Sequence, residues 1–316
     1  MLPYTVRRLG FAVVQAVVVL VATFGVTALL PGDAASIVLG EQATDDQLAQ
    51  VRHQLGLDQP VLDLFGHWLG GLVTGDLGRS LVTGAPVTDE LTRRFAATAL
   101  LAAVTLLVLV PLALFVGVTS GLQEGSRADR WLTTVTVFLH AIPEFVLGML
   151  LLAGFAVYIG LLPATAAGMT GTELAGRPEV LVLPVAVLVA RQLCDIARQL
   201  RIGVAEQNAG PVAEHLRLLG LRERTVVLRH LLPGAAAPAV QQLARAVEGL
   251  LTGTVIVESL FAITGLGTGF VEAVQNRDIP QVQAYVLVFA GVVVLGNLAA
   301  DLVAHRLTPR RELVTW

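Results

Sequence analysis

Several ionisable side chains lie inside long apolar stretches of this sequence, where a charge is costly unless it has a partner or a purpose, and five of them could line a path. They are His140, Glu144, Arg245, Glu248 and Glu258. In a membrane span, such residues usually face the interior of the helix bundle or a water-filled path. We therefore interpret all five as candidates for the wall of a translocation path.

Each of these residues also has a purely structural interpretation. Glu144 follows Pro143, which kinks a helix, so its carboxyl group can instead be satisfied by a neighbouring helix or kept protonated by burial. His140 and Glu144, four apart, favour a helix-stabilising pair over a site for a cation in transit. Glu258 is either a gate or interface residue or a simple helix-end anchor.

Arg245 and Glu248 are three residues apart, so they share one face of a helix. Their spacing predicts either an ion pair that neutralises itself or a contact with substrate in an inward-facing cavity. Asp301 is predicted to anchor the inner end of the last span.

No arrangement typical of an enzyme or a metal site stands out. Serine–histidine–acid and paired-aspartate arrangements are not apparent, and the histidines lack metal-binding spacings. The sequence has no lysine, which excludes a phosphate-binding G-x-x-x-x-G-K-[ST] loop, and a single cysteine, Cys194. We therefore expect no catalysis, no metal and no bound cofactor, and we interpret the glycine-rich residues 265–269 as a loop outside the membrane.

A second constellation has the spacing of a docking element. Glu214-His215-Leu216-Arg217-Leu218-Leu219-Gly220 is followed, after nine residues, by His230-Leu231-Leu232-Pro233. A short helix, a glycine and a turn would form a knob, with the three leucines entering a groove of a partner and Glu214, Arg217 and Arg222 around them. Gly220 would permit the sharp exit, and Pro233 would stop the next helix from extending back. The alternative is a solvated basic loop that only sets the topology.

The composition indicates an all-α polytopic membrane protein. Of 316 residues, 55% are hydrophobic and 14% are charged, with a mean hydropathy of +0.74, whereas soluble domains are about 25% charged. A bilayer core takes about 20 apolar residues as a helix. The sequence predicts six spans over residues 9–30, 95–120, 131–157, 180–197, 238–261 and 282–303.

The arginines orient these spans. Fourteen of the 21 arginines fall on the side of the N-terminus, counting Arg191, which lies toward that end of its predicted span; six fall on the opposite side, and Arg245 lies within a span. The positive-inside rule then places both termini in the cytoplasm.

The external segment, residues 31–94, is the one stretch that resembles soluble protein. Thr44 and Gln47 form a predicted capping box, opening a short helix that ends at Leu55 and Gly56. Pro60 is predicted to open a second helix. The apolar face of that helix comprises Leu62, Phe65, Trp68 and Leu69.

The knob sequence resembles the E-A-A-x-x-x-G, nine residues, I-x-L-P motif of ABC importer permeases, with His215, Leu216 and His230 as departures. Further short sequences along the chain are similar to those of the dipeptide, oligopeptide and nickel permeases, in the first of their two membrane subunits. These phrases are Pro31-Gly32-Asp33, Leu55-Gly56-Leu57-Asp58-Gln59-Pro60, Gly75-Asp76-Leu77-Gly78-Arg79-Ser80, Pro143-Glu144-Phe145-Val146-Leu147-Gly148, Val257-Glu258, Gly265-Leu266-Gly267 and Asn276-Arg277-Asp278-Ile279-Pro280.

The resemblance implies an ABC type I importer permease fold in a bacterial plasma membrane, working by alternating access. Residues 1–93 would hold the first span and the external segment, and residues 94–316 the permease domain with a coupling loop at 200–233. The implied partners are a second permease, two ATPase subunits that carry ATP and Mg²⁺, and an external substrate-binding protein, with no nucleic acid. The knob would be the coupling helix; its bulkier residues predict a matched ATPase groove.

The resemblance leaves the substrate open. Di- or oligopeptides are the first expectation, and nickel, haem or glutathione are the alternatives. A membrane scaffold without transport and an intramembrane enzyme remain as distant alternatives.

Overall fold

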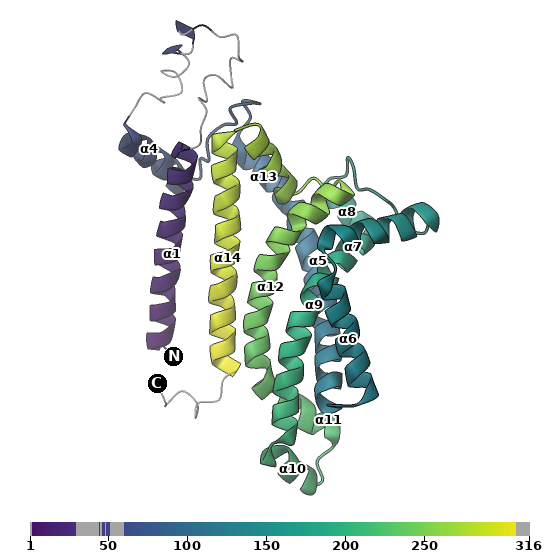
Figure 1. Cartoon of the computed structure of the whole chain (residues 1–316). Coiled ribbons are helices and arrows are strands. Elements are labelled where there is room, and N and C mark those ends of the chain that lie inside the picture. The colour runs from purple at the N-terminus through teal and green to yellow at the C-terminus, as the bar shows by residue number, and fades with distance from the viewer. Residues whose placement is uncertain (1, 30–43, 45, 48, 51–59, 308–316) are drawn as a thin grey trace.

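All regular structure in the described part of the chain is helical (Figure 1). The computed structural model describes residues 2–29, 44, 46–47, 49–50 and 60–307. A single isolated bridge joins Arg79 to Pro86 within these residues. The all-α prediction is therefore confirmed for this part of the chain.

Four helices are each long and apolar enough to cross a membrane without interruption. They are α1 (Leu2–Leu29), α5 (Val87–Leu122), α9 (Pro178–Ala209) and α14 (Ile279–Leu307). They correspond to the predicted spans one, two, four and six. Two bent helix pairs supply the remaining candidates, which raises the count to six if each pair is one span.

The first bent pair replaces the predicted third span. Helix α6 (Arg127–Ala141) meets α7 (Glu144–Leu151) and the π-helix η1 (Leu152–Tyr158) at 101°. Ile142 has extended backbone angles, φ −79° and ψ 125°, because Pro143 disfavours the helical conformation in the residue before it. The expected helical pairing of His140 with Glu144 is therefore wrong, since the two residues lie on different helices.

The second bent pair contains the predicted fifth span. Helix α11 (Glu223–Val226), the π-helix η2 (Val227–Leu231) and α12 (Leu232–Phe261) follow one another directly, and α13 (Leu266–Gln275) turns away at 82°. Pro233 lies in the first turn of α12, as predicted, but no break precedes it: the chain before Leu232 continues as a π-helical turn. The predicted loop at residues 265–269 is also wrong, since α13 starts at Leu266.

The external segment shows part of what the sequence predicts. The side chain of Gln47 accepts a hydrogen bond of 3.0 Å from the Thr44 backbone N–H, as in a capping box; the predicted end at Leu55 and Gly56 lies outside the described residues. Helix α4 (Val61–Thr74) begins directly after Pro60. Its Phe65 and Trp68 rings lie 5.1 and 5.7 Å from that of Phe24 on α1, so this apolar face packs on the first span.

Helix α9 is the central element of the bundle. It packs against α5, α6, α7 and α12, and most of its apolar side chains are buried. Gly117 and Gly121 allow α5 to approach closely, because a Cβ at Gly117 would lie 2.5 Å from the Cβ of Leu200.

The two ends of the bundle differ in their small helices. Helix α10 (Pro211–Leu218) and α11 lie at one end, together with the start of α1 and the end of α14 (Figure 1). Helices α4, α8 (Gly171–Gly176) and α13 lie toward the opposite end.

Candidate functional site

The knob predicted from the sequence is present at the end of α9. Pro211 occupies the first turn of α10, where its missing N–H is an unpaired position in any helix. Gly220 follows the helix with φ +78°, in the left-handed region that favours glycine. The prediction of a short helix with a glycine exit is confirmed.

A small apolar cluster fixes the knob to its own chain. Ala213 of α10 is buried with Val226, Val227 and Leu231, and Leu216 packs against them. This corrects one expectation: Leu216 contacts its own chain and is not available to a partner groove. The inner face of α10 is therefore occupied within the chain.

Arg217 braces the knob at two points. Its guanidinium donates to both carboxylate oxygens of Glu223, at 3.0 and 2.7 Å, and to the Asn208 side-chain oxygen at 2.5 Å. The hydrogen-bonded carboxylate raises the pKa of Arg217 above its usual value. Arg217 thus ties α10 to the end of α9 and the start of α11, whereas the sequence placed it in a charged ring around a partner contact.

The outer surface of the knob is apolar at its centre. Val212 and Leu219 are each 63% exposed and Leu218 is 80% exposed. Glu214, His215 and Arg222 are exposed around them. We call Val212, Glu214, His215, Leu218 and Leu219 the knob surface; it has the apolar centre and polar edge expected of a contact with another protein.

Inside the bundle, Arg191 of α9 joins two of the predicted path residues. Its Nη1 atom lies 2.8 Å from Nε2 of His140, and its Nε atom lies 3.5 Å from Oε1 of Glu144. His140 lies in the last turn of α6 and Glu144 begins α7, so the break between the two helices presents both side chains to α9. The sequence shows no signal for this arrangement, because Arg191 is distant from both residues along the chain.

The Glu144 carboxylate lies against α12 at Gly253, where the absence of a side chain leaves room for it. A Cβ at Gly253 of α12 would lie 3.0 Å from Oε2 of Glu144. Glu144 is therefore enclosed between α9 and α12, and 13% of its side chain is exposed, against 42% for Arg191.

His140, Cys194 and Asp195 also converge, with possible metal-ligating atoms all within 4.8 Å of one another. Both ring nitrogens of His140 are engaged, however: Nδ1 lies 2.8 Å from the Arg191 carbonyl oxygen, and the Arg191 guanidinium approaches the ring. A metal ion here would face a fixed positive charge, so the donor set does not fit a metal centre.

Arg245 and Glu248 do not form the expected ion pair. Arg245 is exposed and donates to the side-chain oxygen of Gln242 at 2.8 Å, whereas Glu248 accepts from Asn297 of α14 at 2.6 Å. The two side chains leave α12 in different directions. The interpretation as a self-neutralising pair is therefore wrong.

Glu258 is an internal anchor at the end of α12. Its side chain is fully buried; it accepts from Thr98 of α5 at 2.6 Å and from the Thr268 backbone N–H at 3.1 Å. It thus holds the start of α13 against α5 and α12. Of the two roles predicted for Glu258, this geometry favours the helix-end anchor over the path.

Asp301 forms an ion pair with Arg8, with 3.0 Å between Oδ2 and Nη1, and this pair ties the end of α14 to the start of α1. This agrees with its predicted anchoring role. The two segments meet at the same end of the bundle as the knob (Figure 1).

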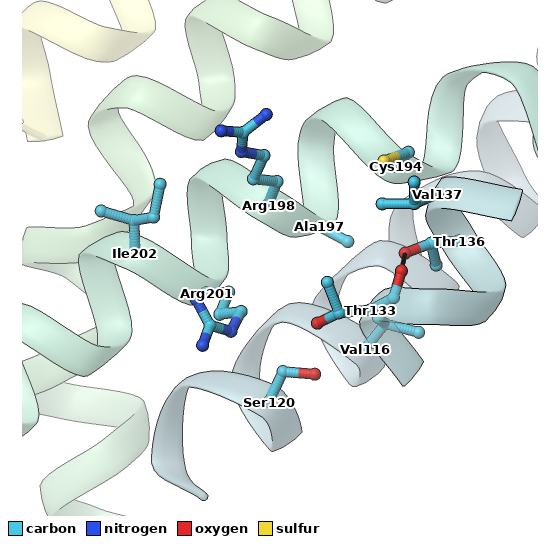
Figure 2. A pocket seen from close by; sticks show the side chains of 10 residues that line it. All are labelled: Val116, Ser120, Thr133, Thr136, Val137, Cys194, Ala197, Arg198, Arg201 and Ile202. Atoms are coloured by element: carbon cyan, nitrogen blue, oxygen red, sulfur yellow. Dashed lines mark hydrogen bonds between the residues drawn. The ribbon is translucent and has the colours of Figure 1, made fainter. Parts of the chain in front are cut away.

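A cavity of about 320 Å³ lies between α5, α6 and α9 (Figure 2). Thr133 and Thr136 line it from α6, and Cys194 and Arg198 from α9. At one edge, Arg201 is held by Asp129 of α6 through hydrogen bonds of 2.6 and 2.9 Å. This charged pair fastens α6 to α9 at a point closer to the C-terminal end of α9 than Arg191.

Two family models match the chain. The model described as the inner membrane component of binding-protein-dependent transport systems covers residues 110–313, and the one for the N-terminal part of such membrane components covers residues 1–102.

The chain is also similar to curated proteins over nearly its whole length. It is 33% and 32% identical to the glutathione transport system permease proteins of Escherichia coli strains CFT073 and K12. It is 34% identical to that of Pectobacterium atrosepticum. In each case the match covers 98% of both chains.

Proposed function

Because the chain belongs to the family of inner membrane components of binding-protein-dependent transport systems, it is a multi-pass permease subunit of an ABC importer, and we propose that it carries small peptides, glutathione first. As a permease it is not itself catalytic, and the family holds no cofactor. The observation that carries the substrate proposal is the similarity to glutathione permeases over 98% of both chains.

This similarity shifts the order of the substrates. The sequence motifs alone favoured di- and oligopeptides in general, with glutathione, nickel and haem as alternatives. Glutathione is itself a tripeptide derivative with two carboxylates and one ammonium group. A path containing Arg191, Glu144 and His140 offers charged and polar partners to such a molecule.

The knob surface supports a proposal for the partners. Helix-in-groove docking transmits rigid-body motion, and the exposed Val212, Leu218 and Leu219 suit a groove on an ATPase subunit. The full assembly would hold this chain, a second permease, two ATPase subunits with ATP and Mg²⁺, and an external binding protein. The knob would then lie in the cytoplasm, with both termini on the same side and residues 31–94 outside.

The bracing of the knob supports a route for the motion. Arg217 links α10 to Asn208 near the end of α9, and α9 runs without a break from Ala209 to Arg191. At 1.5 Å per residue, this stretch is about 27 Å long. A displacement of the knob by the ATPases would therefore move Arg191 with the same helix, which is the coupling that alternating access requires.

Uptake in cells tests this function. A strain lacking only this chain is given labelled glutathione, a labelled dipeptide and nickel in parallel, with the wild-type chain restored as the control. We expect loss of glutathione uptake and its return on restoration. Unchanged uptake of all three would contradict the proposed substrates, and loss of the dipeptide alone would return the substrate to ordinary peptides.

The coupling role is tested with Leu218→Ala and, as a matched control, Leu107→Ala on α5, whose side chain is 73% exposed. Leu218→Ala should lower uptake at normal expression, and Leu107→Ala should not. Equal uptake by both variants would remove the knob surface from the mechanism.

A further inference from the structure

We propose that Arg191 and Glu144 form a subsite that binds the γ-glutamyl end of glutathione, an amino-acid group with both charges on one carbon, as the substrate passes through the permease. In this subsite, Arg191 takes the carboxylate and Glu144 takes the ammonium group. The inference rests on the proposed peptide substrate, and it assigns a role to Arg191, a residue that no sequence motif singles out.

The depth of the two residues is the first support. Arg191 lies 13 residues after the start of α9 and 18 before its end, which places it about 20 Å and about 27 Å from the two ends. A charge near the middle of a span is expensive and needs a compensating partner or a function. Arg191 is therefore at the level where a substrate in transit would be held.

The ion pair between the two residues is loose, which is the second support. The distance from Nε of Arg191 to Oε1 of Glu144 is 3.5 Å, whereas charge-assisted N–H···O bonds are usually about 2.7–2.9 Å long. The hydrogen bonds of Arg191 run from Nη1 to His140, and Nη2 has no hydrogen-bond partner among the described residues. The guanidinium thus keeps donors for an incoming carboxylate.

The surroundings keep the two charges in place. His140 holds the guanidinium from α6, and Gly253 leaves the space in which the Glu144 carboxylate lies against α12. Three helices therefore fix the positions of the two charges before any ligand arrives. Such preorganisation reduces the cost of binding a small polar ligand.

The charge pattern matches one chemical group. Arg191 and Glu144 present one positive and one negative charge side by side, with Asp195 close to His140. The γ-glutamyl end of glutathione carries a carboxylate and an ammonium on the same carbon. It can replace the loose protein–protein pair by two protein–substrate pairs, so that each charge stays compensated. A purely anionic ligand would leave Glu144 beside a like charge.

The test uses the complete transporter, with its binding protein, in proteoliposomes. Three labelled substrates are compared: glutathione, glutaryl-cysteinylglycine, which lacks the α-ammonium, and 4-aminobutyryl-cysteinylglycine, which lacks the α-carboxylate. The variants are Arg191→Gln and Glu144→Gln, with Arg198→Gln on the same helix as the matched control. Each variant is compared with wild type for the same substrate, so differences in delivery by the binding protein cancel.

If the subsite exists, Arg191→Gln lowers glutathione uptake about tenfold or more, as expected for loss of a charge-assisted hydrogen bond. It leaves uptake of the analogue without the carboxylate within about twofold. Glu144→Gln shows the same pattern with the analogue that lacks the ammonium group. Arg198→Gln changes none of the three.

Equal losses for all three substrates, or no loss, would overturn the subsite, because a merely structural role does not distinguish the analogues. Basal ATP hydrolysis and the yield of the assembled complex show whether a variant is folded. If the wild-type complex does not carry glutathione, the proposed substrate fails. A labelled γ-glutamyl dipeptide and its glutaryl and 4-aminobutyryl analogues then decide the subsite by the same comparison.

Discussion

Ser80 and Asp278 are 198 positions apart, and the Ser80 hydroxyl donates a hydrogen bond of 2.5 Å to the Asp278 carboxylate. The same carboxylate accepts the Leu81 backbone N–H at 3.2 Å. Two of the short phrases that the sequence shares with peptide permeases, Gly75–Ser80 and Asn276–Pro280, thus meet in one buried contact between the segment before α5 and the start of α14.

Removing this contact should lower the stability of the end of the bundle opposite the knob. Ser80→Ala leaves the buried Asp278 carboxylate without one donor, which costs about 1–3 kcal/mol. We expect a lower Tm for the purified transporter, whereas Thr83→Ala in the same loop, at an exposed side chain, should change it little. Equal Tm values for the two variants would argue against a structural role for the contact.

Arg217→Ala should separate stability from transport. Arg217 and Glu223 are both partly exposed, so their ion pair contributes only about 0–1 kcal/mol to stability. The brace between α10, α9 and α11 is lost, however, so fewer substrate molecules should be imported per ATP hydrolysed. Uptake and hydrolysis are measured on the same vesicles, with Arg127→Ala, at an exposed residue of α6 outside the knob, as the control; an unchanged ratio would mean that the brace is not needed.

Gly220→Ala tests the left-handed exit of the knob. A side chain at φ +78° costs about 1–2 kcal/mol, so the variant should couple less well, and Gly220→Pro, whose ring fixes φ near −65°, should abolish uptake. Gly66→Ala in α4, where a Cβ would meet open space, is the control and should be neutral or slightly stabilising. Normal uptake with Gly220→Pro at normal expression would contradict the assigned geometry.

Glu258→Gln should destabilise the joint of α5, α12 and α13. The amide keeps one acceptor oxygen and replaces the other with an NH2 group, so it can accept from Thr98 or from Thr268 but not from both, and loss of one such bond costs about 1–3 kcal/mol. Glu272→Gln, which weakens a more exposed pair with Arg94, is the control with an expected change of about 0–1 kcal/mol. A larger fall in Tm for Glu272→Gln than for Glu258→Gln would contradict the role of Glu258 as the anchor of this joint.

Gly253→Ala should act on the bundle interior without removing a charge. The added Cβ would lie 3.0 Å from the Glu144 carboxylate, which must then shift away from α12. We expect reduced glutathione uptake with nearly normal assembly. The control is Gly291→Ala on α14, where a Cβ meets nothing within 4 Å, and it should affect neither. Assembly yield and uptake are compared for both variants.

Features that depend on neighbouring residues could be predicted from the sequence. The apolar runs located the four uninterrupted spans, Pro60 and Gly220 marked the start of α4 and the exit of the knob, and the spacing from Glu214 to Gly220 located α10. Each of these features depends on a local propensity or on a period, and both are visible in a single sequence.

Features that depend on contacts between distant helices could not be predicted in this way. Arg191 contacts His140 and Glu144 only because the break between α6 and α7 lies beside α9. Leu216 packs against Val226 and Leu231, which follow it after the turn at Gly220. Pro233 marked the first turn of α12, but a proline also predicts an interruption before it, and the chain instead continues through the π-helical turn Val227–Leu231. The phrases shared with peptide permeases located Glu258, but they did not distinguish an anchor from a path residue.

The interruption between Ala141 and Glu144 also determines which parts of the third segment can move together. Asp129 fastens α6 to α9 through Arg201, whereas α7 packs closely on α12, with Gly148 against Leu260. No continuous ladder of helical hydrogen bonds crosses Ile142 and Pro143. The segment is therefore two rods with separate attachments, and a change of angle between them leaves the internal bonds of each rod intact.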